Sequence, residues 1–267
     1  MSLICTYKKL IMLLKSKIIG KGSDILIVLH GFLGMSDNWN SFAKKIDNQG
    51  FQIHLLDQRN HGESFHSKEF NYKLLSNDLK YYIDHHQIKN FSLIGHSMGG
   101  KTAMMFSSCY PNAINKLIVV DILPIYYKND YQNILKALKS IDLDSIGSRL
   151  EADKALSSSI ESPSFRAFLL KNLKRISKNE LVFKIDLNII LDTLNEVEKA
   201  LPTDLYFGGE TLFIKGQNSD YINNQNFKSI QKIFPKSRLV EVSNAGHWVH
   251  AENLDDFVKE TLLFLKS

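Results

Sequence analysis

Short apolar runs recur along the chain, and each is rich in β-branched and aromatic residues. They occupy residues 25–29, 51–56, 91–94, 117–120, 212–214 and 239–242. Runs of this length and composition, set between turn-forming residues, are typical of buried strands. The pattern therefore predicts a sheet that contains these segments.

Apolar residues at helical spacing fill much of the chain between the runs. Ser36 is a candidate N-cap, and the helix after it would carry a stripe of large apolar residues. That stripe consists of Trp39, Phe42 and Ile46, and a second stripe consists of Leu75, Leu79, Tyr82 and Ile83. The alternation of strands and helices predicts an α/β fold, with a mostly parallel sheet flanked by helices on both faces.

The alternation lapses between Ile122 and Phe207, where helical stripes follow one another without a strand-like run. Ser162-Pro163 has the pattern of a helix start, with proline at the first helical position. The stripes consist of Ile134, Leu138 and Ile141, of Phe165, Phe168, Leu169 and Leu173, and of Leu187, Ile190, Leu191 and Leu194. We expect a helical cap without strands over residues 122–206, inserted between core segments 1–121 and 207–267. Such a cap would cover the substrate site.

The stretch GHSMG, residues 95–99, joins the run at 91–94 to a helix-like segment that begins at Lys101. A serine flanked by glycines on such a turn is typical of a nucleophile elbow, because the small residues let strand and helix pass closely. Ser97 is therefore the candidate nucleophile. A serine hydroxyl reacts poorly at neutral pH, so it needs a base within hydrogen-bond reach.

Chain order favours His247 as that base, since hydrolases with this elbow place the histidine after the serine and the acid. His247 lies in a glycine-bearing loop after the run at 239–242. His250 is the other histidine in this region, and we expect it to face solvent or to pack locally.

An acyl-transfer reaction also needs two backbone N–H groups that point at the developing oxyanion. Met98 follows the nucleophile and is expected to supply one of them. Phe32 is expected to supply the other, because it lies in the glycine-rich turn HGFLG at the end of the first run.

The segment DQRNHGES, residues 57–64, is rich in polar side chains and follows the second run. Turn-forming and hydrogen-bonding residues of this kind commonly fix a long loop to a sheet. We expect a structural role for it, and His61 precedes Ser97, which is the wrong chain order for the base.

Six motifs together resemble the α/β-hydrolase superfamily, most closely the YbfF-type bacterial esterases: HGFLG, DQRNHGES, GHSMGGK, VVDILP, GQNSDYI and NAGHWVHAE. The resemblance covers residues 12–267 and is looser in the cap. It implies an α/β-hydrolase fold and a serine carboxylesterase or thioesterase without a cofactor. Short to medium acyl esters are the implied substrates, and acyl-CoA is a further candidate. Alternatives on the same fold are a carbon–carbon bond hydrolase, a menaquinone-pathway lyase and a receptor that binds its ligand without turnover.

The acid that orients His247 has two candidates. Many superfamily members carry it three residues after the glycine that ends the strand at 212–214, but Ser219 holds that position here and Asp220 is one residue further. Asp121 directly follows an earlier run, at a second place where this fold carries the acid. The Asn-Ser pair of GQNSDYI resembles the YbfF-type pattern, which implies Asp121 as the acid and leaves Asp220 as the alternative.

The amino-acid composition and charge of the chain limit the kinds of binding partner that we expect. Hydrophobic residues make up 44% of the chain and charged residues 23%, which is typical of a folded globular protein. The formal charge is +5, but the lysines are scattered, so we expect no nucleic-acid partner. The expected partner is a small-molecule ester or thioester, and the sequence does not indicate an oligomeric state.

Cysteine content and the N-terminal residues bear on location. Cys5 and Cys109 are too few for a disulfide framework or a zinc site, which favours a reducing, cytoplasmic location and no metal. No run approaches the roughly 18 apolar residues of a membrane span. The apolar run at 10–14 is short for a signal peptide, and we expect residues 1–11 to be an extension.

Overall fold

The computed structural model describes residues 12–128, 130–177 and 180–267. The extension expected at residues 1–11 lies outside this part of the chain.

The core is a seven-stranded sheet in the order β1-β3-β2-β4-β5-β8-β9. Its strands are β1 Ser16–Ile19, β2 Asp24–Leu29, β3 Phe51–Leu56, β4 Phe91–His96, β5 Ile114–Val120, β8 Thr211–Gly216 and β9 Ser237–Val242. All neighbours pair in parallel except β1, which pairs antiparallel with β3. The structure therefore confirms all the predicted strands and adds β1. That strand was missed because it is a short edge strand without an apolar run, and Ile18 is 49% exposed.

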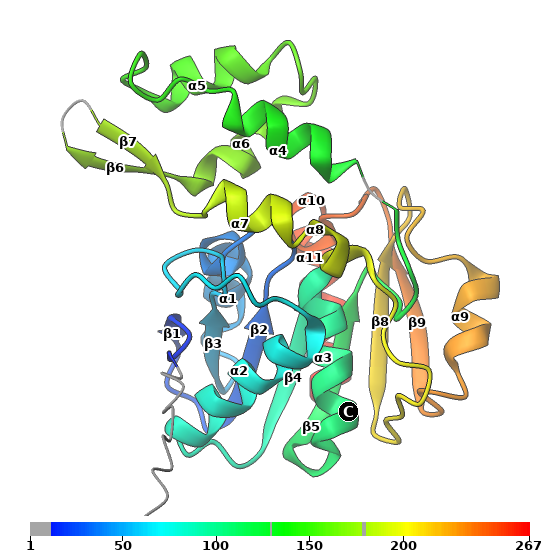
Figure 1. The fold of residues 1–267 in the computed structure, drawn as a ribbon. Helices are drawn as coiled ribbons and strands as arrows, with labels where there is room; N and C mark the ends of the chain where they lie inside the picture. The colour runs from blue at the N-terminus through cyan, green and yellow to red at the C-terminus, as the bar shows by residue number, and fades with distance from the viewer. Residues whose placement is uncertain (1–11, 129, 178–179) are drawn as a thin grey trace, which may run out of the picture.

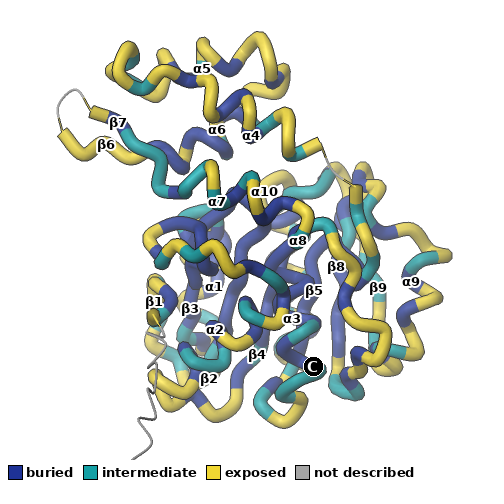
Figure 2. The backbone as a smooth tube through the Cα atoms, viewed as in Figure 1, coloured by how far each residue is buried: buried dark blue, intermediate teal, exposed yellow. Residues whose placement is uncertain are grey.

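Helices cover both faces of this sheet (Figure 1). The core helices are α1 Asn40–Ile46, α2 Tyr72–His85, α3 Met98–Cys109, α9 Asn224–Ile230, α10 Val249–Glu252 and α11 Leu254–Leu265, with 3₁₀ turns η1 Ser36–Trp39 and η2 Pro111–Ala113. Successive residues of β4 point to opposite faces, so Leu93 packs with Phe106 of α3 while Ile94 packs with Phe257 of α11. Burial on both faces explains why the strands are continuous apolar runs (Figure 2).

The first of these helices begins differently from the prediction. Ser36 does not cap it, because residue 36 is already the first residue of η1 and Met35 is the N-cap. The Ser36 N–H instead donates to Asp57 Oδ1 at 2.7 Å. A carboxylate from the loop after β3 thus accepts a hydrogen bond from the first backbone N–H of this turn, and the Ser36 hydroxyl does not cap it.

The segment between β5 and β8 lies above the core in Figure 1. It contains α4 Tyr131–Lys139, α5 Arg149–Leu156, α6 Pro163–Leu169, η3 Leu170–Asn172, β6 Leu173–Ser177, β7 Glu180–Phe183, α7 Leu187–Asp192 and α8 Leu194–Glu198. Helix α6 begins as predicted, with Ser162 Oγ accepting a hydrogen bond from the Phe165 N–H at 3.3 Å. The boundaries at 121/122 and 206/207 stay a prediction.

The expectation that this segment holds no strands is wrong. Strands β6 and β7 form an antiparallel hairpin in which Leu173 pairs with Phe183. Leu173 was assigned to the stripe of α6, but it is the only buried residue of β6. A strand whose other positions are exposed has no apolar run, so the pattern could not reveal it.

Candidate active site

Ser97 lies on the sharp turn between β4 and α3. Its backbone has φ 51° and ψ −117°, and its N–H donates to the Val120 carbonyl at 3.0 Å. Non-glycine residues rarely adopt a positive φ, and such strain is concentrated at functional sites. A Cβ at Gly95 would lie 2.2 Å from the Gly99 carbonyl oxygen, and a Cβ at Gly99 would lie 2.4 Å from that of Leu29. Both glycines are therefore required for this turn.

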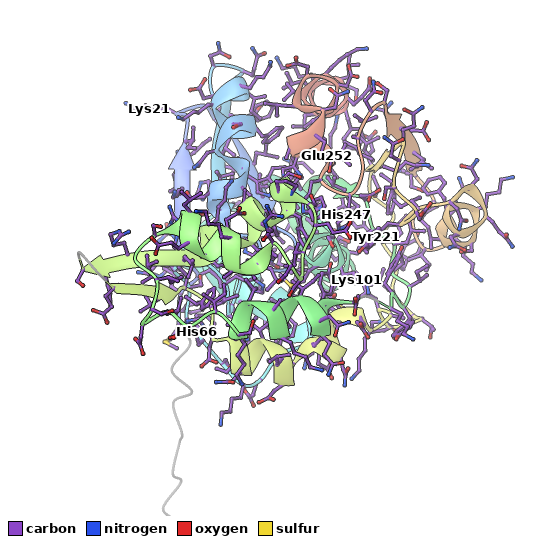
Figure 3. All side chains as sticks on the ribbon, turned by 90° about the horizontal axis from the view of Figure 1, so that it is seen from above. Lys21, His66, Lys101, Tyr221, His247 and Glu252 are labelled. Atoms are coloured by element: carbon purple, nitrogen blue, oxygen red, sulfur yellow. The ribbon has the colours of Figure 1, made fainter. Side chains whose placement is uncertain are left out.

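His247 and Asp121 meet although 126 residues separate them. His247 Nδ1 lies 2.8 Å from Asp121 Oδ2, and the Asp121 side chain is fully buried at the end of β5. The Tyr221 ring stacks on the imidazole, with 3.9 Å between ring centroids and 18° between the planes. Figure 3 shows His247 and Tyr221 close together near the centre of the molecule. The imidazole is thus oriented by a carboxylate at its edge and an aromatic ring on its face.

The carboxylate of Asp121 has two further donors. The Gly216 N–H donates to Oδ1 at 3.3 Å, and the Ser219 hydroxyl donates to Oδ2, the oxygen that also faces His247. Asp220, the alternative acid, is exposed and makes no hydrogen bond with His247 in the described structure. The structure therefore brings Asp121, and not Asp220, to the imidazole, while the catalytic role of Asp121 stays a prediction.

Ser97 and His247 line one cavity of about 10 Å³, which we call the reaction cavity. Its other lining residues are Phe32, Leu33, His96, Tyr131, Phe165, Phe168 and Trp248. No hydrogen bond joins Ser97 Oγ to His247 among the residues described here. Catalytic hydrogen bonds are often loose in a site without substrate and tighten when it binds.

Tyr131, the first residue of α4, separates the reaction cavity from a second cavity of about 10 Å³. Ser97 lines both cavities, and the second one also contains Lys101 and Tyr221. A space of this size holds about one water molecule. A ligand larger than a water molecule therefore requires that the segment carrying Tyr131 moves.

The two predicted oxyanion donors lie beside Ser97. Met98 is the first residue of α3, where backbone N–H groups have no partner within the helix. In the turn after β2, the Leu33 and Gly34 N–H groups are bonded to His61 Nε2 and to the Gly31 carbonyl, while the Phe32 N–H has no partner among the described residues. A Cβ at Gly31 would lie 2.6 Å from His96 Nδ1, so glycine permits the close approach of this turn to the serine. The roles of Phe32 and Met98 stay predictions.

The segment at 57–64 fixes the shape of the turn after β2, in agreement with its expected structural role. The His30 and His61 side chains accept hydrogen bonds through Nε2 from the Gln58 and Leu33 N–H groups, at 3.0 and 3.2 Å. Burial lowers the pKa of His30 to about 4 and that of His61 to about 3. Both rings are therefore neutral at physiological pH, which leaves Nε2 free to accept.

Other buried histidines surround the site. His250 packs locally, one of the two expectations for it, because its ring stacks on Trp39 at 4.0 Å with 3° between the planes. Burial lowers the pKa of His250 to about 3 and that of His96 well below its usual value. His96 Nε2 lies 2.9 Å from the His247 carbonyl oxygen, so it also holds the loop that carries His247.

Lys101 is a buried residue of this region that the sequence did not single out. Its Nζ donates to the Lys199 and Glu198 carbonyls at 2.6 and 3.2 Å, and lies 5.2 Å from the centroid of the Tyr127 ring. Burial lowers the pKa of Lys101 to about 7. The ring of Tyr127 stacks on Tyr221, which in turn stacks on His247. A column of rings thus connects the lysine to the imidazole.

The described residues contain no group of three or more His, Cys, Asp or Glu side chains that could hold a metal ion. Within the same residues, no helix is both long and apolar enough to cross a membrane. The cytoplasmic location stays a prediction.

A core sheet with helices on both faces and a serine on the turn after β4 define a hydrolase of the α/β class. A family model described as the alpha/beta hydrolase fold matches residues 24–254, and the chain belongs to that family. The predicted fold and the resemblance to YbfF-type esterases are confirmed.

Particular relatives carry names of esterases and lipases. The chain is 32% identical over 247 residues to the sn-1-specific diacylglycerol lipase ABHD11 of Mus musculus, covering 90% of this chain and 80% of that protein. It is 29% identical over 244 residues to Esterase YbfF of Escherichia coli K12, covering 90% and 92%. A solved structure titled Marine microorganism esterase superposes with a TM-score of 0.91 at 37% identity, covering 95% of this chain and 99% of that one.

Proposed function

We propose that this protein is a serine carboxylesterase and thioesterase that hydrolyses short to medium acyl esters through an acyl-enzyme. The observation that carries the proposal is the arrangement at the reaction cavity. A strained serine on an elbow lines the same cavity as an imidazole whose other edge faces a buried carboxylate. The relatives named as esterases and lipases support the same reaction class.

Each group has a defined task in this mechanism. His247 removes the proton from Ser97 Oγ, which attacks the acyl carbonyl, and the N–H groups of Phe32 and Met98 stabilise the oxyanion. Asp121 keeps the proton on Nδ1 and stabilises the imidazolium. His247 then gives its proton to the leaving alcohol or thiol, and the cycle repeats with water to release the acid.

The closed form of the site suggests how the substrate enters. Phe165 and Phe168 of α6 face Trp248, with ring centroids 5.1 and 5.7 Å apart, and all three rings line the reaction cavity. We propose that movement of α4 and α6 admits the substrate and that the aromatic wall then contacts its acyl or leaving group. The small cavities of the closed form favour closure around the reacting atoms, which excludes bulk water.

The experiment that tests the proposal combines turnover with covalent labelling. The purified protein should hydrolyse p-nitrophenyl butyrate and be labelled by a fluorophosphonate at Ser97. Ser97→Ala should lose about 10⁴-fold in turnover, as removal of the nucleophile does in other serine hydrolases. Ser158→Ala, at an exposed serine in the cap segment, is the matched control and should retain both properties.

The outcomes separate the alternatives on this fold. Turnover in Ser97→Ala close to that of the wild type would refute the mechanism. Labelling of Ser97 without hydrolysis of any ester would favour the ligand receptor. Cleavage of a 1,3-diketone with no ester hydrolysis would favour the carbon–carbon bond hydrolase.

A further inference from the structure

The aromatic wall of the reaction cavity also borders a second, larger space. Phe165, Phe168 and Trp248 also line a groove of about 340 Å³, which we call the outer groove. Its remaining lining comes from Asn38, Ser164, Ala167, Lys171, His250, Ala251 and Glu252. The same three rings therefore lie between the reacting serine and a space large enough for a flexible chain.

The outer groove leads to a third space of about 480 Å³, the basic groove, with which it shares Ala167 and Lys171. The basic groove is lined by Asp37, Asn40, Arg149, Ala167, Lys171 and Lys184. Helix α6 and η3 form a common wall from Phe165 to Lys171, and six residues of helix extend about 9 Å. A row of spaces with shared lining residues thus extends from Ser97 to a cluster of cations.

Two of these cations lack an acidic partner. Arg149 donates to the Leu173 carbonyl at 2.6 Å, and neither Arg149 nor Lys171 forms an ion pair among the described residues. Both side chains are exposed. Unpaired cations that line one groove form a site for an anion, because each can donate charge-assisted hydrogen bonds.

The other charges of the basic groove do not cancel this excess. Asp37 is paired with Lys17, which lies outside the groove. Lys184 lies 3.5 Å from Glu63, and this carboxylate is shared with Lys174 at 2.9 Å. The groove and the ion-pair partners of its lining residues together contain five cations and two carboxylates. The cations are Arg149, Lys171, Lys184, Lys174 and Lys17, and the carboxylates are Asp37 and Glu63, so the net charge around the groove is positive.

We infer that the basic groove is a phosphate subsite, and that the enzyme takes acyl esters or thioesters whose leaving group carries phosphate. The inference rests on the proposed function and adds to it the chemical class of the leaving group. The acyl carbon lies at Ser97, the flexible arm of the leaving group lies in the outer groove, and the phosphate meets Arg149 and Lys171. Hydrolysis is unchanged: the bond from the acyl carbon to oxygen or sulfur breaks, and the leaving group departs with the proton from His247.

The test compares substrates whose leaving groups carry phosphate with counterparts that lack it. Butyryl-CoA is paired with butyryl-pantetheine, and butyrylglycerol 3-phosphate with butyrylglycerol. In at least one pair the phosphate-bearing member should have a kcat/KM about tenfold higher or more, the factor expected from one charge-assisted hydrogen bond. The pair that shows the difference identifies the leaving group as either a nucleotide-bearing thiol or a glycerol phosphate.

Variants test whether the difference in kcat/KM arises from the basic groove. Arg149→Gln with Lys171→Gln should reduce the kcat/KM ratio within the responding pair to about one, and Lys171→Glu should reverse the preference. Lys154→Gln is the matched control, because Lys154 is an exposed lysine of the same helix as Arg149 that does not line the basic groove. Equal kcat/KM values within both pairs, or a ratio that the groove variants leave intact, would overturn the inference. An equal loss in Lys154→Gln would show a diffuse charge effect and would overturn it as well.

A binding measurement separates this inference from the proposed function. Free CoA, pantetheine, glycerol 3-phosphate and glycerol are titrated calorimetrically into Ser97→Ala, a measurement that needs no turnover. A phosphate-bearing ligand that binds about tenfold more tightly than pantetheine or glycerol, and loses this advantage in Lys171→Glu, supports the subsite even if no ester is hydrolysed. Equal affinities for both kinds of ligand would overturn the subsite while leaving the esterase proposal intact.

Discussion

The carboxylate that orients the imidazole is the residue on which sequence and structure can be compared most directly. Asp121 Oδ2 lies 2.8 Å from His247 Nδ1, whereas Asp220 is exposed. Asp121→Asn should lower kcat for p-nitrophenyl butyrate by about 10⁴-fold, because the amide supports the wrong tautomer. Asp220→Asn is the matched control and should cost less than about tenfold. A near-normal Asp121→Asn enzyme together with an inactive Asp220→Asn enzyme would assign the acid to Asp220.

Lys101 offers a second test at single-residue scale. Its Nζ donates to the Lys199 and Glu198 carbonyls, so Lys101→Met leaves both carbonyls without this charged donor. We expect the free energy of unfolding to fall by about 1–3 kcal/mol in urea denaturation. Lys259→Met on the exposed face of α11 is the control and should change it by less than about 0.5 kcal/mol. Unchanged stability in Lys101→Met would show that the cluster does not depend on this lysine.

At the residue scale, the sequence predicts a role where the chemistry has a local signature. Ser97 lies in a glycine-flanked turn, and His247 follows from chain order. Asp121 came from a resemblance, because nothing in the residues around it distinguishes it from Asp220. Tyr221 and Lys101 were missed, since their contacts with His247 and with the end of α8 join segments far apart in the chain.

At the scale of elements, the presence of an apolar run determined which strands could be predicted from the sequence. The strands β2, β3, β4, β5 and β8 are largely buried and β9 is only partly buried, but each of them carries an apolar run, so all of them were found. Strand β1 has two apolar residues and β6 is exposed except at Leu173, so neither has such a run, whereas β7 carries the run 181–183 and was overlooked. The predicted stripe at 187–194 is divided between α7 and α8, with Thr193 between the two helices.

Helix α6 is expected to influence chain-length preference. Phe168 lines both the reaction cavity and the outer groove, so Phe168→Ala should enlarge the space for a longer chain. The ratio of kcat/KM for p-nitrophenyl octanoate to that for butyrate should rise severalfold, while labelling by a small fluorophosphonate changes less. Leu150→Ala on the exposed face of α5 is the control. An unchanged ratio in Phe168→Ala would show that Phe168 only packs.

For the whole molecule, buried histidines predict a dependence of stability on pH. Burial lowers the pKa of His30 and His54 from 6.5 to about 4, and those of His61 and His250 to about 3. The unfolded chain therefore binds more protons than the folded protein below pH 6.5, and the free energy of unfolding should fall as the pH drops from about 6.5 to about 4. The contribution of His30 over this range is on the order of 3 kcal/mol.

Urea denaturation at pH 7.5, 6.0 and 5.0 checks this expectation. His54 lies away from the reaction cavity and bonds the Tyr82 hydroxyl at 2.8 Å, so His54→Gln should flatten the dependence without altering the site. A free energy of unfolding that is constant across this range would contradict the assignment of these histidines as neutral buried groups.

The central claim is that Ser97 forms a covalent acyl-enzyme, and trapping that intermediate is its most direct test. The protein is mixed with excess p-nitrophenyl butyrate, quenched in acid within the first turnovers and analysed by mass spectrometry of its peptides. We expect a butyryl group on Ser97 and no acyl group on the corresponding peptide of the Ser97→Ala variant. A wild-type enzyme that turns over the ester while no acyl group is found on Ser97, or while it is found on another residue, would contradict the account.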